Sequence, residues 1–343
     1  MSVYIHGGLR TPIGVLNGQY RNMRPEMLGA QLIDELIKRY DISQVDGIFC
    51  GNAVGTGGNI GRLMGLMTNL PNSVSAITVD MQCASALMSI EMAYTHIASG
   101  VMDSAIAGGI ESSSLQLDRM YAANDDRKGL YKVAQFSPQD CSPLAMLEGA
   151  ERTIQKHNVL KEDLYPYIIG SHKRASEALN NPHLKSYIMP ITIDGKACVD
   201  ECIRPKMNEK LLSRMKPLLG PNAITNAGNA CLTHDGAAFV YVSNEKGPFR
   251  IYSVMPWAGN PQFSPEGALE STEAILKRTG LTMDDIDVVE WNEAFAIIDV
   301  LFNKAYPKHL EKYNKLGGAL AYGHPYGCSG AILALHCMAA LES

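Results

Sequence analysis

The stretch Val79-Asp80-Met81-Gln82-Cys83-Ala84-Ser85-Ala86-Leu87-Met88 places a cysteine between two different hydrophobic patterns. The run Ala76–Val79 is typical of a strand, and from Ser85 to Ala98 apolar residues recur at helical spacing. Cys83 is therefore expected near a helix N-terminus, where unpaired N–H groups and the helix dipole favour a thiolate. A thiolate is the form of cysteine that nucleophilic acyl transfer requires. A buried structural cysteine is the alternative, and it is the favoured one for this stretch taken alone.

Composition limits the class of protein. The chain has 343 residues, is 46% hydrophobic and 19% charged, and carries a net charge of −5. These values suit a globular protein with a large core, and they argue against a nucleic-acid partner, which would require a basic surface. No apolar run reaches the roughly 18 residues that span a bilayer, and the N-terminus does not resemble a signal peptide. We expect no membrane partner and a cytoplasmic location.

The 8 cysteines are scattered along the chain, and none of them forms a Cys-x-x-Cys motif. This pattern favours free thiols in a reducing compartment over disulfides or a metal site.

Strand and helix patterns alternate in the first third of the chain, which favours an α/β fold with a mostly parallel sheet covered by helices on both faces. The expected strands are Val3–His6, Gly47–Gly51, Ser75–Val79 and Ser104–Gly108, and the expected helices are Pro25–Arg39, Asn59–Thr68 and Ser85–Ala98.

From residue 117 to residue 225 the alternation breaks and polar residues become more frequent. Helices are expected there at Met146–Lys156 and Asp163–Leu179, with a short strand near Met189–Ile193. We interpret residues 117–225 as an inserted loop domain, since loops on a rigid scaffold commonly carry binding residues. Residues 1–116 and 226–247 then form an N-terminal half, and residues 248–343 a C-terminal half.

The two halves resemble each other. The C-terminal half is expected to contain strands at Asp287–Trp291 and Gly318–Ala321, and helices at Pro265–Thr279, Glu293–Tyr306 and Ser329–Leu341; the strand Ala237–Ser243 closes the N-terminal half. A duplicated core is the simplest account. The second copy is expected to be incomplete, because the chain reaches Ser343 where a closing strand should begin.

A histidine takes the place of the cysteine in the second copy. His324 follows the expected strand Gly318–Ala321, among Gly323, Gly327 and Gly330, which permit a tight turn. A lone histidine in such a loop could bond only to its own backbone. Its position, equivalent to that of Cys83, favours instead a base that takes the thiol proton.

Two further junctions carry polar residues. Asn292 follows the expected strand Asp287–Trp291, at the strand end where ligands of α/β sheets gather. A helix N-cap is the alternative and, for Asn292 alone, the favoured interpretation; beside Cys83 and His324 it could hold a water or a substrate oxygen. The segment from Asn226 through Ala227 and Gly228 to Cys231 forms a polar turn before a buried strand, which suits backbone capping or ligand contact.

Taken in order, these motifs resemble the thiolase family along nearly the whole chain. The matching segments are Arg10–Gly14, Gln82–Cys83, Ala107–Ser112, Gly149–Glu151, Asn226–Ala238, Asn292–Ala296 and Gly317–Gly330. Each segment is weak evidence alone. The order of Asn292 before His324 is that of thiolases, whereas decarboxylating ketoacyl synthases carry histidine and asparagine in the reverse order.

The resemblance implies a duplicated βαβαβαββ core in α-β-α-β-α layers with the insertion on it. It implies that Cys83 is acylated by a 3-ketoacyl-CoA, that His324 activates it, and that Asn292 holds a water of the oxyanion hole. Coenzyme A is implied as a substrate and not as a bound cofactor, lying across the insertion near Asn226, Ala227, Gly228 and Cys231. Cys231 stands where the family usually has serine. Met146 is expected to line the acyl pocket, and the assembly is expected to be a homodimer or homotetramer.

The family also uses a second cysteine, in a Cys-x-Gly-Gly-Gly turn that would lie beyond Ser343. Cys328 and Cys337 are the only later cysteines, and neither occupies the matching place. We expect either a shortened chain or an end supplied by another chain. A thiolase-like subunit that is inactive alone, and a condensing enzyme that uses acyl carrier protein, are the alternatives to a thiolase.

Overall fold

A mixed β-sheet organises the first half of the chain. The computed structural model describes residues 1–343 except residues 136, 139–141 and 232. Its main sheet has the order β11-β1-β10-β5-β3-β4, with β2 paired to β10. The strands are β1 (Tyr4–Arg10), β2 (Gly14–Val15), β3 (Gly47–Gly51), β4 (Ser75–Val79), β5 (Ser104–Ser112), β10 (His234–Ser243) and β11 (Phe249–Arg250).

The sequence predicted a mostly parallel sheet, but the observed sheet is mixed. Strands β3, β4 and β5 are parallel, but β10 enters antiparallel between β1 and β5. It does so because β10 follows the long segment 113–233 and enters the sheet from the same edge at which β1 and β5 end. The carboxyl ends of β1, β3, β4 and β5 and the start of β10 therefore share one edge, and the loops that follow these strands meet there.

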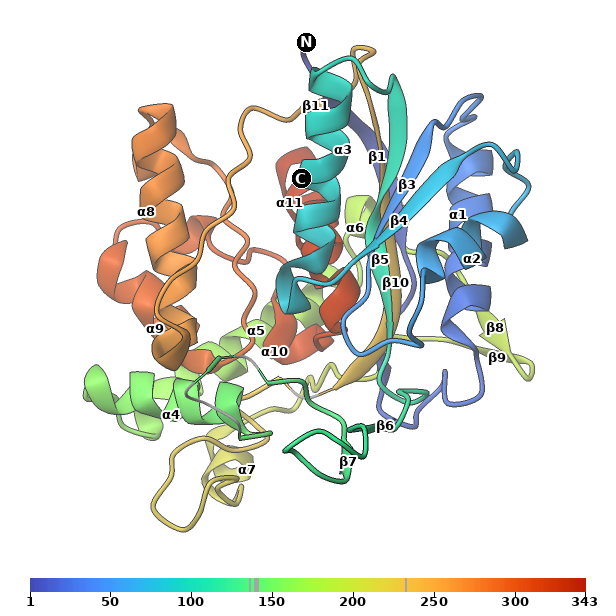
Figure 1. The fold of residues 1–343 in the computed structure, drawn as a ribbon. Coiled ribbons are helices and arrows are strands. Elements are labelled where there is room, and N and C mark those ends of the chain that lie inside the picture. Colours follow the sequence, from blue (N-terminus) through green and yellow to red (C-terminus); the bar gives the residue numbers. More distant parts are fainter. Residues whose placement is uncertain (136, 139–141, 232) are drawn as a thin grey trace.

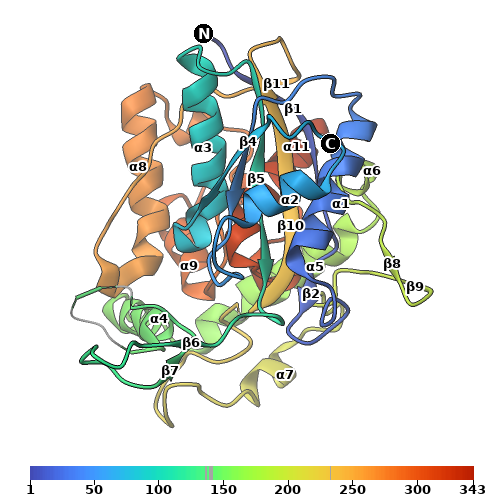
Figure 2. The same cartoon turned by 45° about the vertical axis from the view of Figure 1, so that its right-hand side comes forward.

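Helices cover both faces of the sheet, as the alternating pattern predicted (Figure 1). On one face lie α1 (Pro25–Arg39) and α2 (Ile60–Met67); on the other lie α3 (Ser85–Ala98) and α11 (Ser329–Glu342). Figure 2 shows the sheet between the two pairs. The sequence of α11 has no charged residue before Glu342, and the helix is buried along most of its length, as such a composition requires. In this way the end of the chain packs against the sheet of the first half.

Much of the segment 113–233 lies below the sheet in Figure 1, while residues 182–186 lie higher, against α11. It contains β6 (Arg119–Met120), β7 (Leu130–Tyr131), α4 (Ala145–Lys156), α5 (Tyr165–Ala178), α6 (Pro182–Ser186), β8 (Thr192–Ile193), β9 (Lys196–Ala197) and α7 (Glu209–Ser213). The two predicted helices are confirmed, with α5 preceded by one 3₁₀ turn, and the predicted strand is confirmed as β8. A buried ion pair ties the segment to β1: Arg10 donates to both oxygens of Asp200, at 2.8 and 2.9 Å.

The second half contains α8 (Gly267–Thr279), α9 (Ala296–Ala305), the short α10 (Ala319–Tyr322) and α11, and two predicted strands there are wrong. Gly318–Ala321 forms most of α10 instead of a strand; Ala-Leu-Ala are good helix formers, and they follow a Gly317 with φ of 83°.

The other predicted strand, Asp287–Trp291, makes only a single bridge, between Val289 and Tyr313. The side chain of Asn314 bonds both the N–H and the C=O of Trp291, at 2.9 and 3.0 Å. These two groups would otherwise pair with a neighbouring strand, so ladder formation ends there. Helix α9 begins three residues after the predicted start at Glu293.

Within the described part of the chain, no helix is both long enough and apolar enough to cross a membrane.

Candidate active site

Cys83 lies in a strained turn between β4 and α3. A 3₁₀ turn, η1 (Gln82–Ala84), leads directly into the helix, so the predicted position near a helix N-terminus is confirmed. Gln82 has φ of 51°, in the left-handed region that non-glycine residues rarely adopt. Its N–H donates to Asp80 at 3.0 Å, and its C=O accepts from the Ser85 hydroxyl at 2.6 Å. Such strain persists only where the surroundings impose it, and it is concentrated at functional sites.

The surroundings of Cys83 do not favour a thiolate, and that expectation is corrected. Burial, and after it the negative charge of Glu111, raise the pKa of the Cys83 thiol to about 12. The helix N-terminus is too weak to offset this, since a terminus contributes only about 0.3–1 kcal/mol at an ordinary site. Cys83 is therefore a thiol at neutral pH and needs a base to become a nucleophile.

His324 lies between α10 and a second 3₁₀ turn, η6 (Tyr326–Cys328). Its Nδ1 is 2.6 Å from Ser329 Oγ, and that hydroxyl donates to the C=O of Pro325 at 2.9 Å. Because the single hydroxyl proton is used on Pro325, the serine oxygen accepts from Nδ1–H. The Nε2 atom then carries the lone pair. Burial, followed by the neighbouring His234, lowers the pKa of His324 to about 3, so the imidazole is neutral and can accept a proton.

Close backbone packing holds the histidine turn against the sheet. The N–H of His324 donates to His234 Nδ1 at 3.0 Å. Gly323 has φ of 102°, and a Cβ there would lie 2.5 Å from the His234 ring. Only glycine fits this approach, which explains the glycine before His324 in the sequence.

Asn292 contacts the same imidazole. Its Nδ2 is 3.1 Å from His324 Nε2, the geometry of an amide donating to a lone pair. Its Oδ1 is buried without a hydrogen-bond partner in the structure. The N-cap residue of α9 is Phe295, so the N-cap interpretation of Asn292 is wrong. An unpaired carbonyl oxygen at this place suits a bound water or substrate hydrogen.

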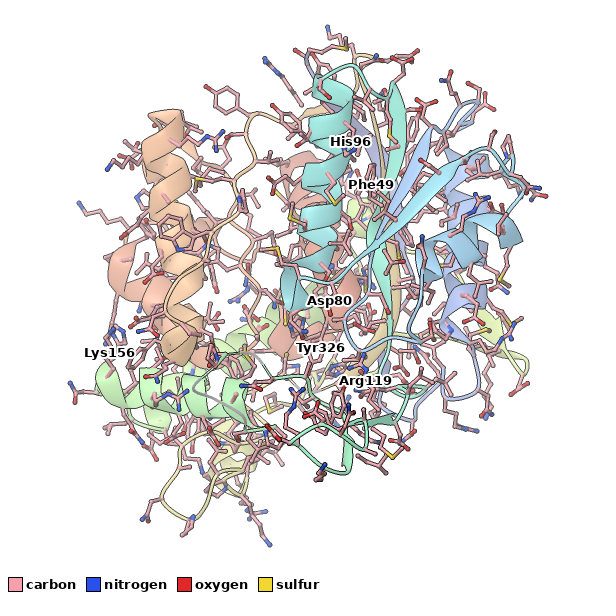
Figure 3. The ribbon with its side chains drawn as sticks, viewed as in Figure 1. Phe49, Asp80, His96, Arg119, Lys156 and Tyr326 are labelled. Carbon is pink, nitrogen blue, oxygen red and sulfur yellow. The ribbon has the colours of Figure 1, made fainter. Side chains whose placement is uncertain are left out.

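Cys83 and His324, 241 positions apart in the numbering, line one cavity of about 490 Å³. Met146 and Cys231 line it as well, together with Phe295. Arg119, Lys132 and Tyr326 also contribute to its wall; the Tyr326 ring meets the His324 ring edge-on at 4.9 Å. Figure 3 shows Asp80, Tyr326 and Arg119 gathered below the lower end of α3. The cavity is largely apolar, with a thiol, a neutral imidazole and two cationic side chains on its wall.

The remaining predicted ligand contacts lie beside this cavity. Ala227 and Gly228 line a neighbouring cavity of about 210 Å³, and Cys231 lines both cavities. Asn226 is buried and closes its own turn, accepting from the Gly228 N–H at 2.8 Å and donating to the Ile224 C=O at 3.0 Å. The backbone-capping interpretation therefore describes its side chain in this structure.

The described cysteines are free thiols, as expected, and Cys141 lies outside the described residues. Cys328 is buried and donates to the Gly236 C=O at 3.3 Å, while Cys337 packs against the hydrophobic core. Neither lines the cavity of Cys83. Among the described residues, no group of three or more His, Cys, Asp or Glu side chains is placed to hold a metal ion.

Glu111 lies in the matching segment Ala107–Ser112, but it was not predicted to be a site residue. It lies in the buried strand β5, and both of its oxygens accept hydrogen bonds from the loops around the cavity. The signal was present, because a carboxylate inside the otherwise uncharged run Ala105–Ser112 must find buried partners.

Comparison with known proteins matches almost the entire chain to two family models. "Thiolase, N-terminal domain" covers residues 3–246, and "Thiolase, C-terminal domain" covers residues 249–343.

Individual relatives agree with these matches. A putative acetyl-CoA C-acetyltransferase of Staphylococcus epidermidis is 31% identical over 339 residues, covering 94% of this chain and 88% of the relative. The protein of the same description from Staphylococcus haemolyticus is 32% identical over 341 residues, with the same coverage. The crystal structure of the Bacillus anthracis acetyl-CoA acetyltransferase matches 99% of this chain and 92% of its own with a TM-score of 0.91, at 24% identity, which supports the fold.

Proposed function

This chain belongs to the thiolase family, and on that premise we propose that it transfers acyl groups between 3-ketoacyl-CoA and coenzyme A through a thioester on Cys83. The observation that carries the proposal is that Cys83 and His324 line one cavity, although 241 positions separate them in the sequence. A thiol, a neutral imidazole and the Ser329 hydroxyl that orients it through Nδ1 make up a nucleophile–base–orienter arrangement. The Nε2 lone pair accepts from Asn292 Nδ2 in this structure, and that amide must release it when the thiol proton is transferred.

In the cleavage direction, the thiol proton of Cys83 passes to His324 Nε2 and the sulfur attacks the 3-keto carbonyl carbon. The bond between C2 and C3 breaks and the acyl group stays on sulfur as a thioester. The electron pair of the broken bond leaves on C2, as the enolate of acetyl-CoA. The His324 imidazolium returns the proton to C2. Coenzyme A then gives its thiol proton to His324, its sulfur takes the acyl group, and Cys83 recovers the proton.

The high pKa of Cys83 and the low pKa of His324 determine when the proton is transferred. A stable thiolate–imidazolium pair does not form beforehand, so proton transfer accompanies attack on the carbonyl. Asn292 Nδ2 lies 3.1 Å from His324 Nε2 and holds the imidazole ring in place. The unpaired Oδ1 of Asn292 can accept a hydrogen bond from a water. We propose that this water and the imidazolium stabilise the oxyanion.

For coenzyme A we propose contacts at Met146, Asn226, Ala227, Gly228 and Cys231. Their location on two adjoining cavities supports a path for the pantetheine arm from the insertion to Cys83. The Asn226 side chain is engaged in its own turn, so its contribution would be to hold that turn.

The names of the relatives suggest acetoacetyl-CoA as substrate, with two acetyl-CoA as products. The family resemblance supports a homodimer or homotetramer, and the free thiols support a reducing compartment such as the cytoplasm. The division into two halves with the inserted segment 117–225 also remains a proposal.

The test uses purified protein with acetoacetyl-CoA and coenzyme A, following loss of the ketoacyl thioester and the mass of the Cys83 peptide. We expect thiolysis and an acetyl adduct on Cys83, both lost in Cys83→Ala. Cys198→Ala, which changes a thiol outside the cavity, is the matched control and should retain both. Absence of thiolysis together with an unmodified Cys83 would refute the proposal, and loading only from acyl carrier protein would replace it with a condensing enzyme.

A further inference from the structure

Glu111 joins two loops that come from distant parts of the chain. Its side chain is fully buried at the end of β5. The Oε2 atom accepts from the backbone N–H of Ala53 at 3.0 Å and from that of Gly327, also at 3.0 Å. One carboxylate oxygen therefore connects the loop after β3 with the turn η6 that follows His324.

The other oxygen secures the same loop after β3. Oε1 accepts from the Asn52 side-chain amide at 3.0 Å and from the Val54 N–H at 3.3 Å. Backbone N–H groups bonded to a charged acceptor make stronger bonds than neutral pairs do. Both oxygens of the carboxyl group are hydrogen-bonded, although burial still raises its pKa to about 7.

Both joined loops belong to the wall of the catalytic cavity. Ala53 and Val54 line it, as do His324 and Tyr326 of the histidine turn and Cys83. The turn sits directly on the sheet end: a Cβ on Gly109 would lie 2.0 Å from the Gly327 carbonyl oxygen, and one on Gly327 would lie 2.6 Å from that of Ile110. This approach leaves no space for a side chain between them, so the N–H of Gly327 has a fixed direction toward Glu111.

We propose that Glu111 is a positioning residue, whose carboxylate fixes the His324 turn to the loop after β3 and so holds His324 in place in the cavity that Cys83 also lines. The inference rests on the proposed function, because it requires His324 to act on Cys83. Loss of the bridge leaves two buried N–H groups without an acceptor and releases the turn at Gly327. A displacement of about 1 Å between base and nucleophile is enough to cost about a hundredfold in rate.

Two substitutions of Glu111 distinguish the effect of its bridging oxygen from the effect of its negative charge. Glu111→Gln removes the charge but keeps one oxygen, which can occupy the Oε2 position between Ala53 and Gly327. Glu111→Leu removes the charge and the acceptor together. The difference between these two variants therefore measures the acceptor between Ala53 and Gly327, together with the effect of the amide NH2 that Glu111→Gln turns toward the Asn52 and Val54 donors.

The readout is the rate at which iodoacetamide alkylates Cys83 at one fixed pH, followed by the mass of its peptide. This rate does not require turnover, so a failed thiolase assay would not affect it. We expect alkylation to be about tenfold slower in Glu111→Leu than in Glu111→Gln, as for partial loss of a general base. In the His324→Ala background the two variants should differ by less than about twofold, because the residue through which Glu111 acts is gone.

A difference of the same size in both backgrounds, or no difference when His324 is present, would overturn the proposal. Thermal unfolding is recorded for every variant. If Glu111→Leu does not fold, Glu111→Ala takes its place, since it removes the same oxygens without adding bulk beside Gly327. Asn52→Ala is the control: it removes a contact to Oε1 but leaves the bridging oxygen, and it should alkylate like the unchanged protein.

Discussion

The Nδ1 atom of His324 lies 2.6 Å from Ser329 Oγ, and this contact determines which nitrogen of the imidazole is free. The Ser329 hydroxyl donates its proton to the Pro325 C=O, so its oxygen accepts from Nδ1–H of His324. The Nε2 atom therefore carries the lone pair, and it faces Asn292. A base that must take a proton from a thiol requires this tautomer.

Ser329→Ala should therefore slow acylation of Cys83 without unfolding the protein. The Nδ1–H loses its acceptor and the other tautomer becomes competitive, in which Nε2 carries a proton and cannot act as base. We expect a fall of about 10- to 100-fold, the range for loss of a group that orients a ligating or catalytic histidine. The measurement is the single-turnover rate of adduct formation from acetoacetyl-CoA. Ser329→Thr keeps the hydroxyl and should recover most of the rate; equal rates in the alanine variant and the unchanged protein would contradict this role.

The pH dependence of Cys83 should reflect its burial. Since its pKa is raised to about 12, the thiolate fraction increases about tenfold per pH unit throughout the neutral and mildly alkaline range. In the His324→Ala variant, where no base assists the thiol, alkylation by iodoacetamide should follow that slope between about pH 7 and pH 9 without levelling off. A small free thiol levels off near its own pKa of about 8.5 and provides the control. If the alkylation rate of Cys83 levels off below pH 8, the pKa of the thiol is set by the helix N-terminus and not by burial.

Local patterns predicted the first half of the fold well, because its strands and helices are bounded by their own sequence. Helix α1 and strands β3 and β4 have the bounds that periodicity gave, Pro25–Arg39 among them. The mixed character of the sheet was not predictable in this way. The direction of β10 depends on where the chain returns after more than a hundred residues, and no local spacing contains that information.

In the second half, a predicted strand is wrong because side-chain hydrogen bonds take the place of backbone pairing between strands. Asn314 bonds the backbone of Trp291 and ends a ladder that the apolar run Asp287–Trp291 suggested. In the site, residue types and order predicted that Cys83 and His324 act together, and both line one cavity, but they could not give the ionisation of either. A pKa depends on burial and on charges such as that of Glu111, which only the folded arrangement brings near.

The buried ion pair between Arg10 and Asp200 should be essential for joining the segment 113–233 to the sheet. Both side chains are almost fully buried, and Asp200 also accepts from the Ile13 N–H at 2.8 Å. Asp200→Asn leaves the guanidinium without a counter-charge, and breaking a buried pair in this way costs about 3–5 kcal/mol. Urea unfolding should show this loss. Glu35→Gln, which breaks the surface pair with Arg39, is the control and should leave the midpoint almost unchanged.

Glu111 should make the stability of the protein depend on pH with a sign opposite to that of an ordinary salt-bridged carboxylate. Burial raises its pKa from 4.5 to about 7, despite the N–H groups of Ala53, Val54 and Gly327, and the charge of Asp80 adds to the increase. Below about pH 4.5 the side chain is protonated in both the folded and the unfolded chain, so it costs nothing. Between about pH 4.5 and pH 7 the unfolded chain is ionised while the folded chain still holds its proton. The free energy of unfolding therefore falls by up to about 3 kcal/mol as the pH rises through this range.

Glu111→Gln cannot ionise, so any change in hydrogen bonding that it introduces is constant with pH. The free energy of unfolding of this variant, relative to the unchanged protein, should therefore rise between about pH 4.5 and pH 8. Urea titrations of both proteins at a series of pH values measure this difference directly. A difference that falls with rising pH would mean that the hydrogen bonds to the carboxylate outweigh its burial, and that Glu111 is a stabilising anion at neutral pH.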